Sequence, residues 1–142
     1  MKTGAALLLL VLQAMCGPAS AQSAAQTLAA ACPKAHEMSQ RHLLGLWRAE
    51  FEGMAQGATL LLDKHPEFPD SVRGQVNRNG ELAEVSGDVD DGDFTLEESV
   101  NGTNISATWL GDVVEGSCGR EIRGTWQSEA GKRPYPFVLR KL

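Results

Sequence analysis

The residues best placed to bind a metal ion form an acidic run around Gly92. Four aspartates flank this glycine: Asp88, Asp90, Asp91 and Asp93. Glu98 follows at the spacing of an EF-hand calcium loop, but Gly87 and Val89 then occupy the positions of its first two carboxylate ligands. The run therefore predicts a tight hairpin turn at Asp91-Gly92, which needs the same residue types, in place of a calcium site.

Histidines near the start of the chain are the other candidate metal ligands. His36, Met38 and His42 lie close together in the sequence, and His65 follows further along. Their spacing matches no standard copper or zinc site, so we interpret them as solvated side chains. The sequence predicts no metal site and no cofactor.

Motifs of known enzymes are absent from the sequence. It contains no Gly-x-Ser-x-Gly, no phosphate-binding glycine loop and no His-Glu-x-x-His. Glu97 and Glu98 are neighbours in a predicted strand and so point to opposite faces, which prevents them from acting as a catalytic pair. We therefore expect a protein that is not an enzyme.

One charged residue is predicted to face the interior of the fold. Arg120 is in phase with Cys118 and Ile122 along a predicted strand. There its guanidinium could receive an anionic group of a ligand. At the mouth of the fold this side chain is expected to be solvated, and binding of an anionic ligand group is the alternative.

Turn signals at nearly even spacing predict the elements that position these residues. Asn79-Gly80, Asp91-Gly92 and Asn101-Gly102 supply the positive-φ residues that two-residue hairpins require. Eight strand-like runs are separated by such breaks, at residues 43–52, 57–64, 71–78, 81–89, 93–100, 103–110, 117–128 and 134–141. Short connections pair each strand with the next, which predicts an all-β fold, an eight-stranded antiparallel up-and-down barrel. A β-sandwich is the alternative.

Alternation of apolar residues within these runs predicts which face points inward. Four aromatic residues on this face are the predicted ligand-binding residues: Trp47, Trp109, Trp126 and Phe137. Ile105, in the sixth run, shares this face. Seven small residues from several runs share it as well: Gly45, Ala49, Gly74, Ala83, Gly87, Ala107 and Gly124. The small residues either let the strands coil tightly around the tryptophans or leave a pocket unfilled.

The start of the first run, Leu43-Leu44-Gly45-Leu46-Trp47, resembles the Gly-x-Trp that opens the barrel of the calycins. This group contains the lipocalins, the fatty-acid-binding proteins and the avidins. The resemblance covers most of residues 43–142 and implies a calycin-like barrel. By similarity to lipocalins, it also implies that a basic residue of the last strand, Arg140 or Lys141, packs over Trp47.

Two further similarities bear on function. Trp109 and Trp126 resemble the aromatic lining of an avidin interior, but Ala49 replaces the asparagine with which avidins bind biotin, so biotin binding is not implied. The first run is also similar to the Leu-x-Gly-x-Trp of small bacterial metalloprotease inhibitors. These exported barrels insert their N-terminal segment into the protease.

The first residues predict export. An apolar run precedes Ala19-Ser20-Ala21, a pattern that signal peptidase cleaves, so we predict a signal peptide at residues 1–21. The run is shorter than the roughly 20 residues that span a bilayer, and no membrane span is predicted. A lipid anchor at Cys16 is the alternative, although the residues before it do not fit a lipobox. Residues 22–42 are predicted as an alanine-rich, partly helical leader and residues 43–142 as the barrel domain.

Cleavage at this site leaves two cysteines, Cys32 and Cys118. In an exported protein such a pair is expected to form a disulfide, which here would tether the leader to the barrel. A reactive thiol at Cys118 is the alternative. The predicted location is the periplasm or the extracellular medium.

The charge of the chain narrows the range of partners. Its formal net charge is −5, and no stretch interleaves basic with aromatic residues, so nucleic acids and anionic membranes are not expected to bind. The first hypothesis is an exported binding module for a small apolar or amphipathic ligand. The alternative is a protein-binding periplasmic inhibitor that acts through its leader or through loops such as His65–Asp70.

Overall fold

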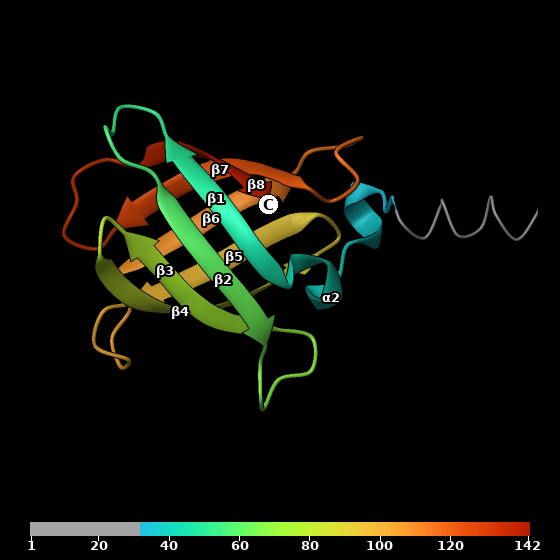
Figure 1. The fold of residues 1–142 in the computed structure, drawn as a ribbon, viewed down its shortest axis with the longest axis horizontal. Helices are drawn as coiled ribbons and strands as arrows, with labels where there is room; N and C mark the ends of the chain where they lie inside the picture. The colour runs from blue at the N-terminus through green and yellow to red at the C-terminus, as the bar shows by residue number, and fades with distance from the viewer. Residues whose placement is uncertain (1–31) are drawn as a thin grey trace, which may run out of the picture.

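Eight antiparallel strands close into a barrel in the computed structural model, which describes residues 32–142 (Figure 1). The strands are β1 (Gly45–Phe51), β2 (Ala58–Lys64), β3 (Val72–Arg78), β4 (Glu81–Asp90), β5 (Asp93–Ser99), β6 (Ala107–Val113), β7 (Glu121–Ser128) and β8 (Tyr135–Lys141). Each strand pairs with the next, and β8 pairs with β1. The predicted up-and-down barrel is confirmed, and the alternative of a sandwich is wrong. The predicted signal peptide, Cys16 and residues 22–31 lie outside the described residues.

Two of the three predicted hairpin turns are confirmed. Asn79 and Gly80 have φ values of 52° and 92°, and Asp91 and Gly92 have φ values of 50° and 93°. Each pair connects two strands whose last and first residues face each other in register. Positive φ at both central residues is the geometry that matches the twist of the flanking strands. The acidic run around Gly92 therefore forms a hairpin, as predicted.

The third predicted turn, at Asn101-Gly102, is wrong. These residues belong to a longer loop between β5 and β6, in which the side-chain oxygen of Asn101 accepts hydrogen bonds from the backbone N–H groups of Thr103 and Asn104, both at 2.9 Å. Because these donors bond to a side chain, they cannot join a strand ladder. Strand β6 therefore begins at Ala107 instead of residue 103, and Ile105, predicted to face inward, is exposed.

The interior is filled by the apolar face of each strand. The largest fully buried apolar side chains are those of Trp47, Trp109, Phe94, Leu43, Leu60, Leu62, Leu96, Ile122, Leu139, Val72 and Val76. The ring of Trp109 packs between Phe51 and Phe137, with ring centres 5.2 and 5.0 Å away. The barrel therefore has an aromatic core.

Small residues on the inward face allow adjacent strands to approach closely. A Cβ atom added to Gly74 would lie 1.9 Å from the carbonyl oxygen of Leu61, and one added to Gly124 would lie 1.9 Å from that of Leu110. No side chain fits at that distance. At these two positions the interpretation that small residues permit tight coiling is confirmed.

The segment before β1 covers one end of the barrel, which we call the closed end. It contains the 3₁₀ turn η1 (Ala35–Glu37) and the short helix α2 (Gln40–Leu43), at the right of Figure 1. Leu43 is fully buried, Met38 is nearly so, and both join the core. No helix among residues 32–142 is long and apolar enough to cross a membrane.

A disulfide joins Cys32 to Cys118 at this end, as predicted. The bond connects the segment before η1 to the loop between β6 and β7. It closes a chain segment of 86 residues, which on the chain-entropy model stabilises the fold by about 4–5 kcal/mol. A structural disulfide indicates an oxidising compartment.

The opposite end, which we call the open end, carries the β1–β2, β5–β6 and β7–β8 loops and the β3–β4 turn. These loops gather at the left of Figure 1, away from η1 and α2. Within residues 32–142, no helix covers them. The partly buried rings of Trp126 and Tyr135 lie at this end, where β7 runs into β8.

Candidate functional site at the open end

The first tryptophan of the barrel, Trp47, stabilises the closed end. Trp47 is fully buried, and its indole N–H donates a 2.7 Å hydrogen bond to the carbonyl of Leu43. The ammonium of Lys141 lies 5.6 Å from the centre of the same ring and donates a 2.7 Å hydrogen bond to the carbonyl of His42. Lys141 is therefore the basic residue over Trp47 that the calycin resemblance implies, whereas Arg140 pairs with Glu50 and Glu121.

The four predicted aromatic ligand-binding residues lie in two environments. Trp47, Trp109 and Phe137 are almost completely covered by other protein atoms. Trp126 is only partly buried and packs against Phe51 and Tyr135, with ring centres 5.8 and 6.1 Å away. Among the four, Trp126 is therefore the side chain that solvent reaches at the open end.

The prediction that Arg120 faces inward is wrong. This residue is exposed at the closed end, where its guanidinium donates a 3.2 Å hydrogen bond to the carbonyl of Lys141. Alternation does not extend back to it, because β7 begins only at Glu121 and Cys118 has a φ of 54°. Arg120 therefore lies outside the candidate site at the open end.

The charged side chain that does face inward is Glu98, which is 1% exposed. It follows Phe94 and Leu96 in phase along β5 and ends inside the barrel near the open end. One carboxylate oxygen accepts hydrogen bonds from the indole N–H groups of Trp109 and Trp126, both at 3.1 Å. Glu98 is the one charged side chain among residues 32–142 that is fully buried.

Arg78 supplies the opposite charge. It lies at the end of β3, and its two terminal nitrogens donate to the two carboxylate oxygens of Glu98. Its guanidinium carbon lies 4.9 Å from the centre of the Trp126 ring. A buried carboxylate is costly unless it is paired and hydrogen-bonded, and these contacts meet both conditions. The four residues form what we call the Arg78–Glu98 network: Arg78, Glu98, Trp109 and Trp126.

Neither charged member of this network was predicted as a site residue, although each carries a signal in the sequence. Arg78 is in phase with Val72 and Val76 on β3, just as Glu98 is with the apolar residues of β5. Two inward charges of opposite sign on nearby strands are the pattern expected of a buried ion pair. Their meeting across the barrel depends on the register of the strands between them.

A hollow of about 500 Å³ opens beside this network. It lies between the β1–β2 loop and the β3–β4 turn, and its lining residues are Met54, Ala55, Gln56, Arg78, Asn79 and Glu81. The side chain of Arg78 is 23% exposed and lines the hollow, and its guanidinium bonds to Glu98 on the inside. The site combines apolar surface with a preorganised cation and contains no nucleophile next to a base.

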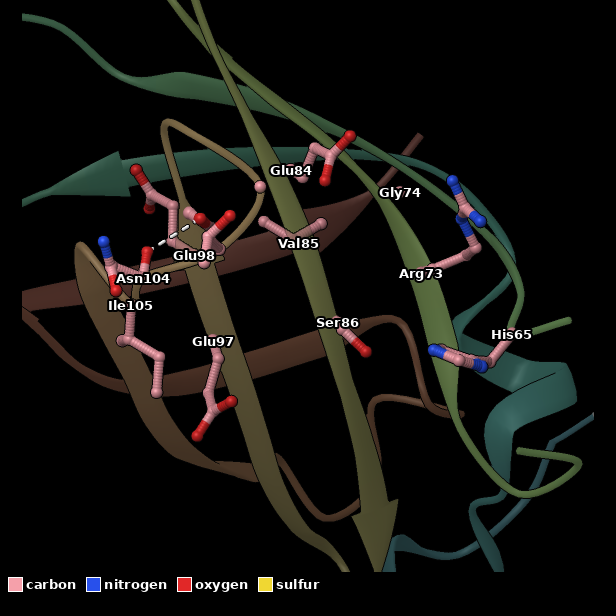
Figure 2. A pocket seen from close by; sticks show the side chains of 13 residues that line it. His65, Arg73, Gly74, Glu84, Val85, Ser86, Glu97, Glu98, Asn104 and Ile105 are labelled. Carbon is pink, nitrogen blue, oxygen red and sulfur yellow. Dashed lines mark hydrogen bonds between the residues drawn. The ribbon is translucent and has the colours of Figure 1, made fainter. Parts of the chain in front are cut away.

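A second hollow, of about 300 Å³, lies on the outer surface of the barrel. Figure 2 shows it across β3, β4 and β5, with Arg73 and His65 on one side and Asn104 and Ile105 on the other. Its walls carry the exposed carboxylates of Glu84 and Glu97 and the partly buried hydroxyl of Ser86. This lining suits an apolar ligand less well than the hollow beside Arg78.

The interpretation of the candidate metal ligands as solvated holds for His36, which is exposed, and is wrong for Met38, which is buried in the core. His42 and His65 are partly buried. The ring of His42 bonds through Nδ1 to the backbone N–H of Ser39 at 3.0 Å, at the start of α2. Burial lowers the pKa of His42, and the charges of Arg41 and Lys141 lower it further. Within residues 32–142, no three His, Cys, Asp or Glu side chains are grouped to hold a metal ion.

Comparison with known proteins adds no family to this description. Neither the models of known protein families nor the curated proteins contain a match to this chain. The barrel is compatible with a calycin-like fold through its eight antiparallel strands and through the packing of Lys141 over Trp47.

Proposed function

We propose that the protein is an exported binding module, without catalytic activity, that takes a small amphipathic ligand at the open end of its barrel. The observation that carries the proposal is the hollow of about 500 Å³ whose wall joins Met54 to Arg78. Pockets for small molecules are typically about 300–1,000 Å³, with apolar walls and a few fixed polar groups.

The contrast between the barrel interior and its open end supports this position for the ligand. Trp47, Trp109 and Phe137 already pack against other side chains in the interior. Trp126 lies at the open end and contacts the guanidinium of Arg78, which lines the hollow. A ligand there would change the environment of Trp126 without requiring the core to open.

Binding of the neutral fluorophore N-phenyl-1-naphthylamine tests the proposal. We expect saturable binding, and we expect Met54→Glu to weaken it about fivefold or more, because the substitution places a charge in the apolar wall. Leu110→Glu is the control, since it places the same charge at an exposed apolar residue of β6 outside this hollow, whereas Met54 is partly buried. Absence of saturable binding, or equal losses in the two variants, would overturn the proposal.

One loop favours a second candidate function, the protein-binding inhibitor. In the loop between β2 and β3, the ring nitrogen Nδ1 of His65 accepts hydrogen bonds from the backbone N–H groups of Glu67 and Phe68, at 3.2 and 3.1 Å. The ring of Phe68 packs 4.7 Å from that of His65 and is still 58% exposed. A rigid loop that presents an aromatic side chain is well suited to anchor a protein partner.

Site-specific photocrosslinking distinguishes this second candidate. With p-benzoylphenylalanine in place of Phe68, irradiation of the producing cells should yield one discrete adduct to another protein, identifiable by mass spectrometry. The same crosslinker in place of Leu110 should yield no such adduct. Identical adduct patterns from the two positions would exclude a partner specific to the loop.

A further inference from the structure

Building on the proposed function, we infer that the ligand is an anionic amphiphile. Its acidic head group, a carboxylate, sulfate or phosphate, binds the outward edge of Arg78, and its apolar part lies against Met54 in the same hollow. Three features support this head group: the hydrogen-bond donors that Arg78 keeps, the way in which its guanidinium is held, and a second cation at the same end of the barrel.

The donors of Arg78 are only partly used by the protein. A guanidinium has five N–H donors, and Arg78 bonds to Glu98 through its two terminal nitrogens. No other acceptor among residues 32–142 takes a hydrogen bond from this side chain. The remaining donors include Nε–H and one terminal N–H, a pair that fits an oxyanion bidentately.

Two contacts fix the orientation of this guanidinium. The carboxylate of Glu98 holds its inner edge, and the ring of Trp126 lies 4.9 Å from its carbon. The carboxylate is itself held by the indole N–H groups of Trp109 and Trp126. A cation that is already oriented loses little side-chain entropy when an anion binds.

A second arginine reaches the open end through aromatic contacts. The guanidinium of Arg133 lies 5.1 Å from the ring centre of Tyr135, and this ring lies 6.1 Å from that of Trp126. Arg78 thus contacts Trp126, whose ring neighbours Tyr135, which in turn contacts Arg133. These contacts place two cations at the same end of the barrel. Arg133 is exposed and contributes a weaker, salt-screened attraction.

The carboxylate of Glu98 already pairs with Arg78, and Glu81 is a second opposing charge, in the wall of the hollow. Its carboxylate repels an anion, but the side chain is exposed, so solvent screens this repulsion. Arg78 is less exposed and can make direct charge-assisted hydrogen bonds, which outweigh a screened charge. Removal of the Glu81 charge should therefore strengthen binding of an anion at Arg78, whereas removal of the Arg78 charge should weaken it.

Three amphiphiles with the same tail test the inference: decyl sulfate, decyltrimethylammonium and decyl maltoside, each below its critical micelle concentration. Calorimetric titration should show decyl sulfate binding about tenfold more tightly than decyltrimethylammonium, the effect expected of charge-assisted hydrogen bonds. Inorganic sulfate, which lacks the tail, should not bind in the same concentration range.

Charge variants locate the head group. Glu81→Gln should strengthen decyl sulfate binding about two- to threefold, and Arg133→Gln should weaken it by a smaller factor, because Arg133 does not line the hollow. The double variant Arg78→Gln with Glu98→Gln removes the buried pair together and should abolish the preference for decyl sulfate while decyl maltoside still binds. Should the double variant fail to fold, the opposite effects at the exposed positions 81 and 133 remain decisive.

The outcomes separate this inference from the proposed function. Binding of none of the three amphiphiles would overturn both. Equal binding of all three, or decyl sulfate binding unchanged by Glu81→Gln and Arg133→Gln, would overturn the inference and leave the binding module intact. Inorganic sulfate binding as tightly as decyl sulfate would overturn the assignment of an amphiphile.

Discussion

The two ends of the barrel satisfy their inward polar groups in different ways. At the closed end, Trp47 and Lys141 donate to backbone carbonyls, those of Leu43 and His42. At the open end, two indole N–H groups donate to the carboxylate of Glu98, which in turn needs Arg78 as its counter-charge. The acceptors are neutral carbonyls at the closed end, whereas at the open end the acceptor is the carboxylate of a buried ion pair.

Under the proposed function, this difference separates the end that stabilises the fold from the end that binds the ligand. A backbone carbonyl needs no counter-charge, whereas a buried carboxylate costs several kcal/mol of desolvation that its partners must offset. Apolar packing of similar volume would often stabilise a protein as well as such a pair does. The ion pair does what apolar packing cannot do, because it holds a guanidinium at the wall of a hollow. The comparison therefore favours the open end as the binding end.

Loss of the disulfide is the largest expected effect and concerns the closed end. Replacement of Cys32 and Cys118 by serine should lower the free energy of unfolding by about 4–5 kcal/mol, because the unfolded chain is no longer constrained. Urea unfolding measures this change. Fluorophore binding by the fraction that remains folded is the control and should be unchanged. A loss below about 1 kcal/mol would show that packing alone holds the segment before β1 in place.

Truncation of Glu98 is the next largest effect and concerns the open end. Glu98→Ala should cost about 3–4 kcal/mol, since it leaves the Arg78 charge and two indole N–H groups without their acceptor. Glu98→Gln should cost clearly less, because its amide oxygen still accepts hydrogen bonds. Both values come from urea unfolding, with ligand binding measured in parallel. Similar small losses in both variants would contradict the view that this carboxylate organises the open end.

The barrel could be predicted from the sequence because each strand has one buried face. In β1, Trp47, Ala49 and Phe51 are buried and alternate with exposed residues, as period-two patterning requires. The pattern failed where a local feature interrupts a ladder. The side chain of Asn101 captures backbone donors that a strand would use, and the positive φ of Cys118 breaks the alternation before β7.

The Arg78–Glu98 network was harder to predict for a different reason. Its four side chains come from β3, β5, β6 and β7, so their contacts depend on strand register and barrel closure, which alternation within one strand does not specify. Phase alone placed Trp109 and Trp126 on the inward face. The same phase places Arg78 and Glu98 on the inward face. The two charges can be recognised as an ion pair only when the positions of β3 and β5 in the barrel are known.

Removal of the Lys141 charge tests the role of the backbone carbonyls at the closed end. Lys141→Met should keep apolar cover over Trp47 but lose the hydrogen bond to His42 and the cation over the ring, at a cost of about 1 kcal/mol. This is well below the cost of Glu98→Ala, because the carbonyl left without its donor is neutral and no buried charge loses its partner. Burial lowers the pKa of Lys141, and the charge of Arg120 lowers it further, so this position disfavours the charged form relative to water. Equal unfolding losses in the two variants would remove the distinction between the ends.

The smallest expected effect is a pH dependence at the closed end. Burial lowers the pKa of His42 below its ordinary value of 6.5, so the folded state binds this proton less readily than the unfolded state. Between the folded pKa and 6.5 the unfolded chain carries more protons, and stability therefore rises with pH and is lost as pH falls.

The change should stay below about 1 kcal/mol, because the ring is only partly buried and solvent screens it. It can be measured separately from the carboxylates, since hydrogen bonds lower the pKa of Glu37 and of Glu121 below 4.5 and so confine their effects to more acidic conditions. Urea unfolding between about pH 5 and pH 7 should show the slope in the native protein and not in His42→Asn. A slope that persists in the variant would assign it to another histidine and detach it from the closed end.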